Sequence, residues 1–372
     1  MKEGWEYKKL GEIATEMYRG SGIKRDQVTK EGTPCVRYGE IYTTYNISFD
    51  TCASHTKIEN VTSPKYFEYG DLLFAITGES VEDIGKTIAY LGDEKCLCGG
   101  DIICMKHHQN PKYLAYALST PDAIRQKGIG KTKLKVVHTN APALKAINIP
   151  LAPLSEQQSI VDYLDSAFAK IDAMKANAEK ALGEAKALFQ ASLKEMLEPK
   201  EGWEEKNLIK EFSLKSGENL SAKNQVIGPY PVYGGNGITG YHNQYNLSGD
   251  QILIGRVGAL CGNIHYIKER IWVTDNAFVV NNISSSWNML FLSYELEYIN
   301  LNQYASQTAQ PVISNKSMKD VSIFQPPLSE QQSIVATLDS LKSKVDRLQA
   351  NYNKISQECA ALKQAILRQV FE

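Results

Sequence analysis

Basic side chains without acidic neighbours are the residues of this chain best suited to binding a polyanion. Residues 123–155 contain no Asp or Glu and supply six positive charges. Lys and Arg neutralise phosphates, so this composition is typical of contact with a nucleic-acid backbone. The basic residues predicted to contact DNA here are Arg125, Lys127, Lys131, Lys133 and Lys135.

A second group of candidates is polar and aromatic rather than cationic. Residues 298–319 lack acids but are rich in amides, which favour adenine edges. Residues 230–241 read YPVYGGNGITGY, and their glycines allow the backbone to approach a ligand closely. Arg256 follows in a glycine-flanked stretch and has the donors to read guanine. The other candidates are Tyr233, Asn236, Tyr241, Gln307, Gln310 and Lys316.

Loops in the first part of the chain supply analogous candidates. These are Lys24, Arg25, Arg37, Tyr38, Tyr45, Thr77 and Lys86. For any single one of them the alternative is an ordinary solvated loop residue, so each cluster carries more weight than its members.

Motifs for catalysis are missing. Gly-Lys-Thr at 85–87 and 130–132 imitates the end of a phosphate-binding loop, but the glycine required five positions earlier is Ser80 or Arg125. The Asn/Asp-Pro-Pro-aromatic tetrapeptide of amino-methyltransferases is absent, as is a glycine-rich dinucleotide-binding turn. We therefore predict a non-catalytic chain that binds no cofactor of its own.

A cluster of thiols and imidazoles raises the question of a zinc site. Its members are Cys96, Cys98, Cys104, His107 and His108. A second matching Cys pair is missing, and buried cysteines commonly pack as small hydrophobic residues. We predict no metal, and we expect all seven cysteines to be reduced.

An internal repeat organises the whole chain. Residues 154–161 read LSEQQSIV, and residues 328–335 repeat the same eight letters. Gly4-Trp5-Glu6 is echoed by Gly202-Trp203-Glu204. Units of this length indicate a tandem duplication of a domain plus a helix, not a solenoid of short repeats.

Each LSEQQSIV motif predicts the start of a long helix. Prolines precede it, and Ser155 with Gln158, or Ser329 with Gln332, has the spacing of a capping box. Neither 155–197 nor 329–372 contains proline, so each helix is predicted to run for most of that length.

The two helices carry a heptad-like seam, which predicts that they pair as an antiparallel coiled coil within one chain. Small residues such as Ala167 and Ala181 dominate the first seam and bulky ones the second, an arrangement that favours close packing. Docking of each helix on its own domain, or homodimerisation, is the alternative. The predicted seam residues are Leu164, Ile171, Met174, Leu188, Leu338, Leu341, Val345, Leu348, Tyr352, Ile355, Leu362 and Ile366.

The segments outside the helices are predicted to be mixed α/β. Short apolar, β-rich runs at 72–76, 101–105, 251–254 and 277–280 indicate strands, and 113–118 and 290–296 indicate short helices. The predicted fold class is therefore α+β, with two mixed α/β globular domains in tandem, each followed by a long helix.

Charge and hydropathy limit the partners. The 41 basic and 42 acidic side chains nearly cancel, so DNA contact must come from local patches. No apolar run is long enough to span a membrane, and the first residues lack the apolar core of a signal peptide. We expect a cytoplasmic protein without a membrane partner.

This architecture resembles the specificity subunit of type I restriction-modification enzymes. The likeness spans essentially the whole chain and rests on the two Leu-Ser-Glu-Gln-Gln helices, the Gly-Trp at each domain start, and Tyr-Gly-Gly-Asn-Gly-Ile-Thr-Gly-Tyr at 233–241. The resemblance implies target-recognition domains at 1–153 and 200–327, and spacer helices at 154–199 and 328–372. The recognition loops of this family vary greatly, so no base contact is carried over.

The resemblance also implies partners and cofactors. Each recognition domain would bind half of an interrupted, asymmetric target on double-stranded DNA, and the helices would dock two adenine-methyltransferase subunits. Restriction (motor-nuclease) subunits would join them. S-adenosylmethionine, ATP and Mg²⁺ would then be bound by those partners.

Two other interpretations stay open. A coiled-coil interaction scaffold would explain the helices but not the paired polar loops. A stand-alone DNA-modifying enzyme would need an acidic metal site, for which the candidates are Asp71, Glu79, Asp93 and Glu94.

Overall fold

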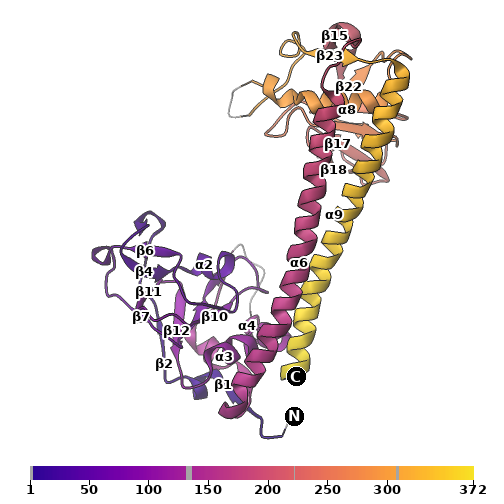
Figure 1. The fold of residues 1–372 in the computed structure, drawn as a ribbon. Coiled ribbons are helices and arrows are strands. Elements are labelled where there is room, and N and C mark those ends of the chain that lie inside the picture. The colour runs from indigo at the N-terminus through magenta and orange to yellow at the C-terminus, as the bar shows by residue number, and fades with distance from the viewer. Residues whose placement is uncertain (1–2, 131–135, 222, 307–309) are drawn as a thin grey trace. The chain divides into compact units, whose positions relative to one another are not determined.

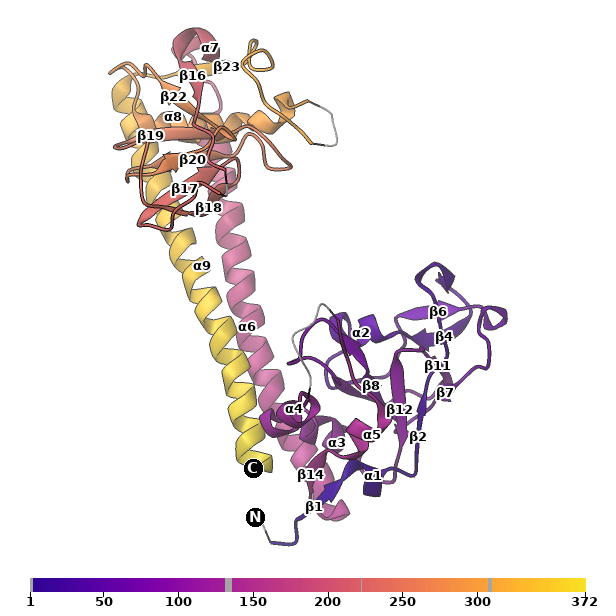
Figure 2. The same ribbon diagram turned by 180° about the vertical axis from the view of Figure 1, so that it is seen from behind.

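The computed structural model describes residues 3–130, 136–221, 223–306 and 310–372. The chain folds into two compact units. Unit 1 comprises residues 1–177 and 353–372, and unit 2 comprises residues 178–352. Each unit contains one globular domain and portions of two long helices (Figures 1 and 2). Among the described residues, no helix is long and apolar enough to cross a membrane.

The globular domain of unit 1 is built on two five-stranded sheets. One has the order β2 (Glu16–Arg19), β12 (Ile102–Lys106), β8 (Leu72–Ala75), β10 (Thr87–Tyr90) and β5 (Ser48–Phe49). The other has the order β3 (Val28–Thr29), β6 (Ser54–Thr56), β4 (Thr33–Val36), β11 (Cys96–Cys98) and β7 (Tyr66–Phe67). Strands β8, β10 and β11 are buried along their whole length, and all their residues except Thr87 and the Tyr90 hydroxyl are apolar.

Two small strand pairs and a set of short helices complete this domain. Strand β1 (Glu6–Lys9) pairs antiparallel with β14 (Asn148–Leu151), and β9 (Thr77–Gly78) pairs with β13 (Val137–His138). The helices are α1 (Leu10–Ile13), α2 (Tyr38–Thr43), α3 (Pro111–Ala117), α4 (Pro121–Lys127) and α5 (Ala141–Lys145), with 3-10 turns at Arg25–Gln27 and Ile58–Asn60.

The globular domain of unit 2 repeats this plan on a smaller scale. Strand β15 (Glu204–Asn207) pairs antiparallel with β23 (Ser322–Gln325), as β1 pairs with β14. The four-stranded sheet has the order β16 (Ser213–Ser216), β22 (Ala277–Asn281), β19 (Gln251–Gly255) and β20 (Ile264–Ile267). The three-stranded sheet has the order β18 (Gly237–His242), β17 (Tyr230–Gly234) and β21 (Trp272–Val273). Its helices are α7 (Leu208–Glu211) and α8 (Met289–Ile299), with a 3-10 turn at Leu301–Tyr304.

The long helices are α6 (Leu154–Leu197) and α9 (Leu328–Phe371), and they pair in antiparallel fashion within each unit. In unit 1, Phe168 lies beneath the Lys363 ammonium at 5.0 Å, and the Cys359 thiol contacts the Ile171 carbonyl at 3.7 Å. In unit 2, Lys186 donates to Gln349 at 2.7 Å, while Lys342 lies over Phe189 at 5.6 Å. The α+β class and the helix pairing predicted from the sequence are therefore confirmed.

The seam predicted for α6 is wrong at alternate positions. Leu164 and Ile171 are buried as expected, but Met174 and Leu188 are exposed. Phe168, Leu182 and Phe189 take the inward positions, one residue further along than the predicted Ala167, Ala181 and Leu188. Several positions of α6 on both the inward and the outward side are alanine, so the heptad pattern fits the helix in two registers that differ by one residue. The larger side chains determine which of the two registers is buried.

The seam predicted for α9 holds along most of the helix and then shifts. Leu338 and Val345 are buried, and four further predicted positions are half-buried: Leu341, Leu348, Tyr352 and Ile355. After Cys359 the buried positions move to Leu367 and Val370; Ile366 is half-buried and Leu362 is exposed. A straight helix drifts relative to a strict seven-residue repeat, so the buried stripe at the end of α9 leaves the predicted seam and continues from Cys359 to Leu367 and Val370.

The predicted capping boxes are also wrong. Both helices begin one residue before the serine, and Ser155 and Ser329 lie inside the first turn. The Pro153 carbonyl accepts a hydrogen bond from the amide of Glu156, and the Pro327 carbonyl accepts from that of Glu330. In each Gln-Gln pair the first glutamine, Gln157 or Gln331, is buried, whereas Gln158 and Gln332, the predicted capping-box members, are exposed.

Candidate nucleic-acid interface

Helix α2 carries the main cluster of candidates in the first globular domain. Two neighbouring hollows share Tyr38, Gly39 and Thr43 of this helix. The first has a volume of about 590 Å³ and is also lined by Arg25 and Arg37. The second has a volume of about 570 Å³ and is also lined by Thr77. Four of the predicted residues, Arg25, Arg37, Tyr38 and Thr77, are thus brought to one surface.

A buried carboxylate holds Arg37 in place on this surface. Glu40 accepts from the Arg37 backbone N–H at 2.8 Å and from its guanidinium at 3.4 Å. Its other contact is the Ser54 hydroxyl, which donates to the same oxygen that accepts from the guanidinium. The Arg37 Nε is buried and has no hydrogen-bond partner among the described residues. Sequence reasoning missed Glu40, although a Glu three positions after an Arg on a short helix is a recognisable signal.

Two of the predicted residues in this domain, Tyr45 and Lys86, make contacts within the domain. Tyr45 is buried, stacks on Phe49 at 4.2 Å between ring centroids, and accepts from the Ala53 amide at 2.7 Å. The Lys86 ammonium donates to the Tyr45 carbonyl at 2.9 Å, just beyond the end of α2, and burial lowers its pKa. The buried Tyr45 ring therefore belongs to the core, which corrects its predicted role. Lys86 is half-buried and lines a pocket, and its predicted contact with DNA stays a prediction.

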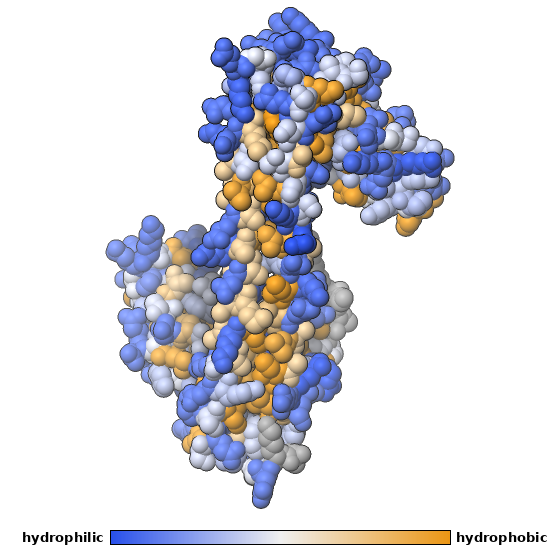
Figure 3. Space-filling view, turned by 45° about the vertical axis from the view of Figure 1, so that its right-hand side comes forward, coloured by the Kyte–Doolittle hydropathy of each residue, from blue (hydrophilic) through white to orange (hydrophobic). Residues whose placement is uncertain are grey.

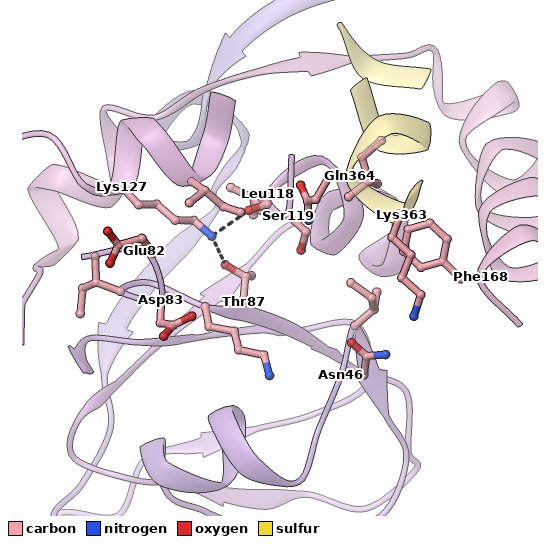
Figure 4. A pocket seen from close by; sticks show the side chains of 15 residues that line it. Asn46, Glu82, Asp83, Thr87, Leu118, Ser119, Lys127, Phe168, Lys363 and Gln364 are labelled. Carbon is pink, nitrogen blue, oxygen red and sulfur yellow. Dashed lines mark hydrogen bonds between the residues drawn. The ribbon is translucent and has the colours of Figure 1, made fainter. Parts of the chain in front are cut away.

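Lys127 is the clearest correction. It is 6% exposed, and its ammonium group donates to the Thr87 hydroxyl at 3.0 Å and to the Leu118 carbonyl at 2.8 Å. Figure 4 shows the side chain turned toward these two groups within a pocket of about 240 Å³. Burial lowers the pKa of Lys127 to about 7. A group held in this way cannot reach a phosphate.

The other basic candidates of this domain are at its surface or outside the described residues. Lys24 is exposed, and Arg125 is exposed and forms an ion pair with Asp122 on helix α4. Lys131, Lys133 and Lys135 lie outside the described residues.

A glycine-dependent junction assembles the candidates of the second domain. A Cβ on Gly255 would lie 2.0 Å from the Gly235 carbonyl, so these two backbones approach as only glycine permits. Asn236 follows Gly235 in the turn between β17 and β18, and is exposed. The Asn236 side-chain oxygen accepts from Asn263 at 3.4 Å. The turn, the start of the 256–263 loop and the ends of two strands therefore lie together.

Arg256 lies at the centre of this junction. Its guanidinium stacks on the Phe278 ring at 4.4 Å and donates to the Asp275 carbonyl at 3.1 Å and to the Ser216 hydroxyl. The backbone of Arg256 and Val257 bonds to the 311–313 segment, since the Ile313 amide donates to the Arg256 carbonyl at 2.8 Å. This pairing brings the amide-rich segment beside Arg256.

The remaining candidates of the second domain differ in exposure. Tyr241, Gln310 and Lys316 are exposed, whereas Tyr233 is buried with its ring 5.8 Å from that of His265. Tyr233 therefore serves the core of the small sheet, which corrects its predicted role as a ligand contact. Gln307 lies outside the described residues.

The described residues offer no metal centre. Among them, no three His, Cys, Asp or Glu side chains are placed to share an ion. All seven cysteines are buried free thiols, and burial raises the pKa of Cys98 and Cys104. Of the acidic candidates, Asp71 is buried in an ion pair with Lys106 at 3.0 Å. Burial nevertheless raises the pKa of the Asp71 carboxyl.

Comparison with known proteins matches the duplicated plan. The family model described as the type I restriction modification DNA specificity domain matches residues 2–182 and 200–357. The EcoprrI specificity subunit of Escherichia coli is 32% identical over 160 residues, which are 42% of this chain and 39% of that subunit. The StySPI specificity subunit of Salmonella potsdam is 24% identical over 100% of this chain and 89% of its own length.

Solved structures share the fold. A chain from a study of complex assembly and conformational transition of the type I restriction-modification system superposes with a TM-score of 0.78 at 19% identity, covering 100% of this chain and 98% of that one. The HsdS subunit from Thermoanaerobacter tengcongensis gives a TM-score of 0.54 at 18% identity, covering 100% and 97%. With the family model matched in both halves of the chain and with the paired long helices of the shared fold, this chain belongs to the family of type I restriction-modification DNA specificity subunits.

Proposed function

We propose that this chain selects a bipartite, asymmetric target on double-stranded DNA, with one half-site bound by each globular domain. Residues 1–153 and 200–327 are the recognition domains in this proposal, and residues 154–199 and 328–372 form the spacer. One observation supports this proposal most strongly. The two globular domains join the long helices in the same way, but the loops that hold the candidate DNA-binding residues differ between them. Identical readers would bind a symmetric target, whereas Arg37 and Tyr38 in one domain and Asn236 and Arg256 in the other present different donors.

The proposal assigns two adenine-methyltransferase subunits to the long helices. Isolated exposed apolar residues are ordinary, but several large ones on a helix pair are typical of a surface that a partner covers. They are Leu154, Tyr163, Met174, Leu188, Leu328 and Leu362. Figure 3 shows moderately to strongly hydrophobic residues along one face of the helices, between hydrophilic edges.

Chemistry belongs to the partner subunits in this proposal. The methyltransferases bring S-adenosylmethionine, and the motor-nuclease subunits that join them bring ATP and Mg²⁺. The chain itself contributes recognition without catalysis.

Methylome sequencing tests the proposal directly. Cells expressing this chain with its methyltransferase are expected to show adenine methylation in two short motifs separated by a gap of fixed length. Cells with the methyltransferase alone are the control. A continuous motif, or methylation that does not depend on this chain, contradicts the proposal.

An interaction scaffold without a DNA role is distinguished by salt. Binding through phosphates weakens steeply as salt rises, because counterions are released on association. Gel-shift titration of the complex with its methyltransferase between low and physiological salt is expected to show this dependence. A complex that ignores salt, or does not bind DNA, favours the scaffold.

A further inference from the structure

The repeated glutamines Gln157 and Gln331 occupy equivalent buried positions at the start of the two long helices. Each lies in the first turn of a helix that begins beside a globular domain, and each is 0% exposed. A fully buried, uncharged amide has four hydrogen-bonding positions to satisfy. Because a buried amide occurs at the same position in both copies, we compare the hydrogen bonds that the two side chains make.

The two side chains make nearly the same contacts. The Gln157 oxygen accepts from the backbone N–H of Asn110 at 2.9 Å, and the Gln331 oxygen accepts from that of Asn288 at 2.7 Å. Asn110 and Asn288 are the N-cap residues of α3 and α8. Helix α3 contacts strand β10, and helix α8 contacts strands β19 and β20. The amide nitrogens donate to the carbonyls of Ala152 at 3.0 Å and Pro326 at 2.8 Å.

Each glutamine therefore connects three elements of one unit. These are the first turn of the long helix, the residue that directly follows the preceding strand, and the capped start of the domain helix. Gln157 also donates to Gln109 at 2.8 Å, and Gln331 also donates to the Ser286 carbonyl at 3.0 Å. Because directional bonds to backbone groups resist rotation more than apolar packing does, such a connection fixes an angle as well as a contact.

We propose that Gln157 and Gln331 are positioning residues that hold each recognition domain at a fixed angle to its helix, and that this stiffness makes the complex discriminate gap length. The inference rests on the proposed function. One base pair added to a duplex rotates and displaces one half-site relative to the other, so a stiff protein must deform the DNA or lose contacts. A protein with a loose joint adapts instead.

The test uses the full chain in complex with its methyltransferase. Duplexes carry both half-sites at the native gap or at a gap one base pair longer or shorter, and dissociation constants are measured for each. The variants are Gln331→Met and Gln157→Met, which keep the side-chain length and remove the polar contacts. The matched control is Gln332→Met, the same substitution one residue along at an exposed position.

The wild-type complex and the control are expected to bind the altered gaps at least about tenfold more weakly than the native gap. In either glutamine variant this ratio is expected to fall to about twofold, while the preference for the correct bases in each half-site is retained. A general loss of stability would lower the melting temperature but leave the ratio unchanged.

A ratio that stays at the wild-type value in both variants overturns the inference, whatever happens to their melting temperatures. The two substitutions lie in separate units, so failure of one variant to fold leaves the other to decide. A wild-type complex without any gap preference overturns the proposed function, and this inference with it.

Discussion

The two globular domains are alike where they meet the long helices and different elsewhere. Trp5 packs against Tyr113 and Phe371 in unit 1, and Trp203 packs against Phe291 in unit 2. Both units pair their first and last strands, and both place a lysine over a helix phenylalanine. By contrast, the sheet that contains β4 and β11 in unit 1 has five strands, whereas the sheet that contains β17 and β18 in unit 2 has three.

This difference separates two kinds of constraint. In each unit the residues that face the long helices must fit the same kind of helix pair, so the duplication has kept residue types such as Trp5 and Trp203 and the strand pairing beside them. The distal sheets and loops face outward and are free to present different side chains. The constant part of each domain is therefore structural, and the divergent part is where the proposed specificity belongs.

The largest effect is expected from equivalent core leucines of the two helices. Leu164 and Leu338 are both 0% exposed and belong to the cores of units 1 and 2 respectively. Leu164→Ala and Leu338→Ala are each expected to lower the free energy of unfolding by about 2 to 5 kcal/mol through lost burial and a residual cavity. Hydrogen exchange is expected to accelerate in β12 for the first variant and in β22 for the second.

The matched control is Leu362→Ala on the same helix pair. Leu362 is 47% exposed, so its replacement is expected to change stability by no more than about 0.5 kcal/mol. If Leu164→Ala and Leu338→Ala accelerate exchange equally in both domains, the two units do not unfold separately and the comparison fails.

Arg256 tests the divergent part. Arg256→Ala removes the guanidinium at the junction of the second domain and is expected to weaken binding by about 1 to 3 kcal/mol if it contacts guanine bidentately. The loss should appear with duplexes carrying the correct second half-site and not depend on the bases of the first. Dissociation constants for duplexes with each half-site scrambled in turn measure this.

Arg256→Lys serves as the companion variant because it keeps the charge and loses the planar fork. It is expected to resemble Arg256→Ala in specificity and the wild type in salt dependence. Equal weakening at both half-sites would assign Arg256 to a general role and remove it from the specificity-determining residues.

Lys127 tests the first domain through pH. Burial lowers its folded-state pKa from 10.5 to about 7, so unfolding takes up a proton between those values. The free energy of unfolding contributed by this group is therefore lowest below pH 7 and rises with pH through the window, by at most about 1.4 kcal/mol per pH unit. Lys127→Met is expected to flatten this rise.

Thermal or denaturant unfolding at pH 6, 7, 8 and 9 measures the difference between wild type and variant, with Lys24→Met as an exposed control. A difference that does not change with pH would mean that the Lys127 ammonium stays charged in the folded protein, satisfied by Thr87 and Leu118.

Regular elements were predictable because short-range patterns determine them. The apolar run at 72–76 forms β8 (Leu72–Ala75), and 290–296 lies within α8 (Met289–Ile299). The long helices run almost as their proline-free sequences indicate. Their seam was predicted less well, since Ala178, Ala181 and Ala185 fit either phase and only the sizes of residues such as Phe168 distinguish them.

Individual site residues were harder to predict because their surroundings come from distant parts of the chain. Arg256 meets the 311–313 segment only through tertiary backbone pairing. Lys127 lies one turn after the buried Ala123 on helix α4, a spacing that places it on the inner face despite its charge. A run of like charges in the sequence hides such a position, because composition is insensitive to which face of a helix a side chain occupies.

The smallest effects are expected from exposed lysines on the two sides of the comparison. Lys24 in the first domain and Lys316 in the second are exposed, and if they contact phosphates they carry no base information. Lys24→Ala and Lys316→Ala are each expected to lower the slope of log affinity against log salt by about 1, with equal loss for correct and scrambled half-sites. Fluorescence anisotropy over a salt series measures both slopes. An unchanged slope would place that lysine away from the DNA. A loss of affinity confined to one half-site sequence would instead make the lysine a base contact, and it would then belong with the specificity-determining residues of the divergent part of its domain.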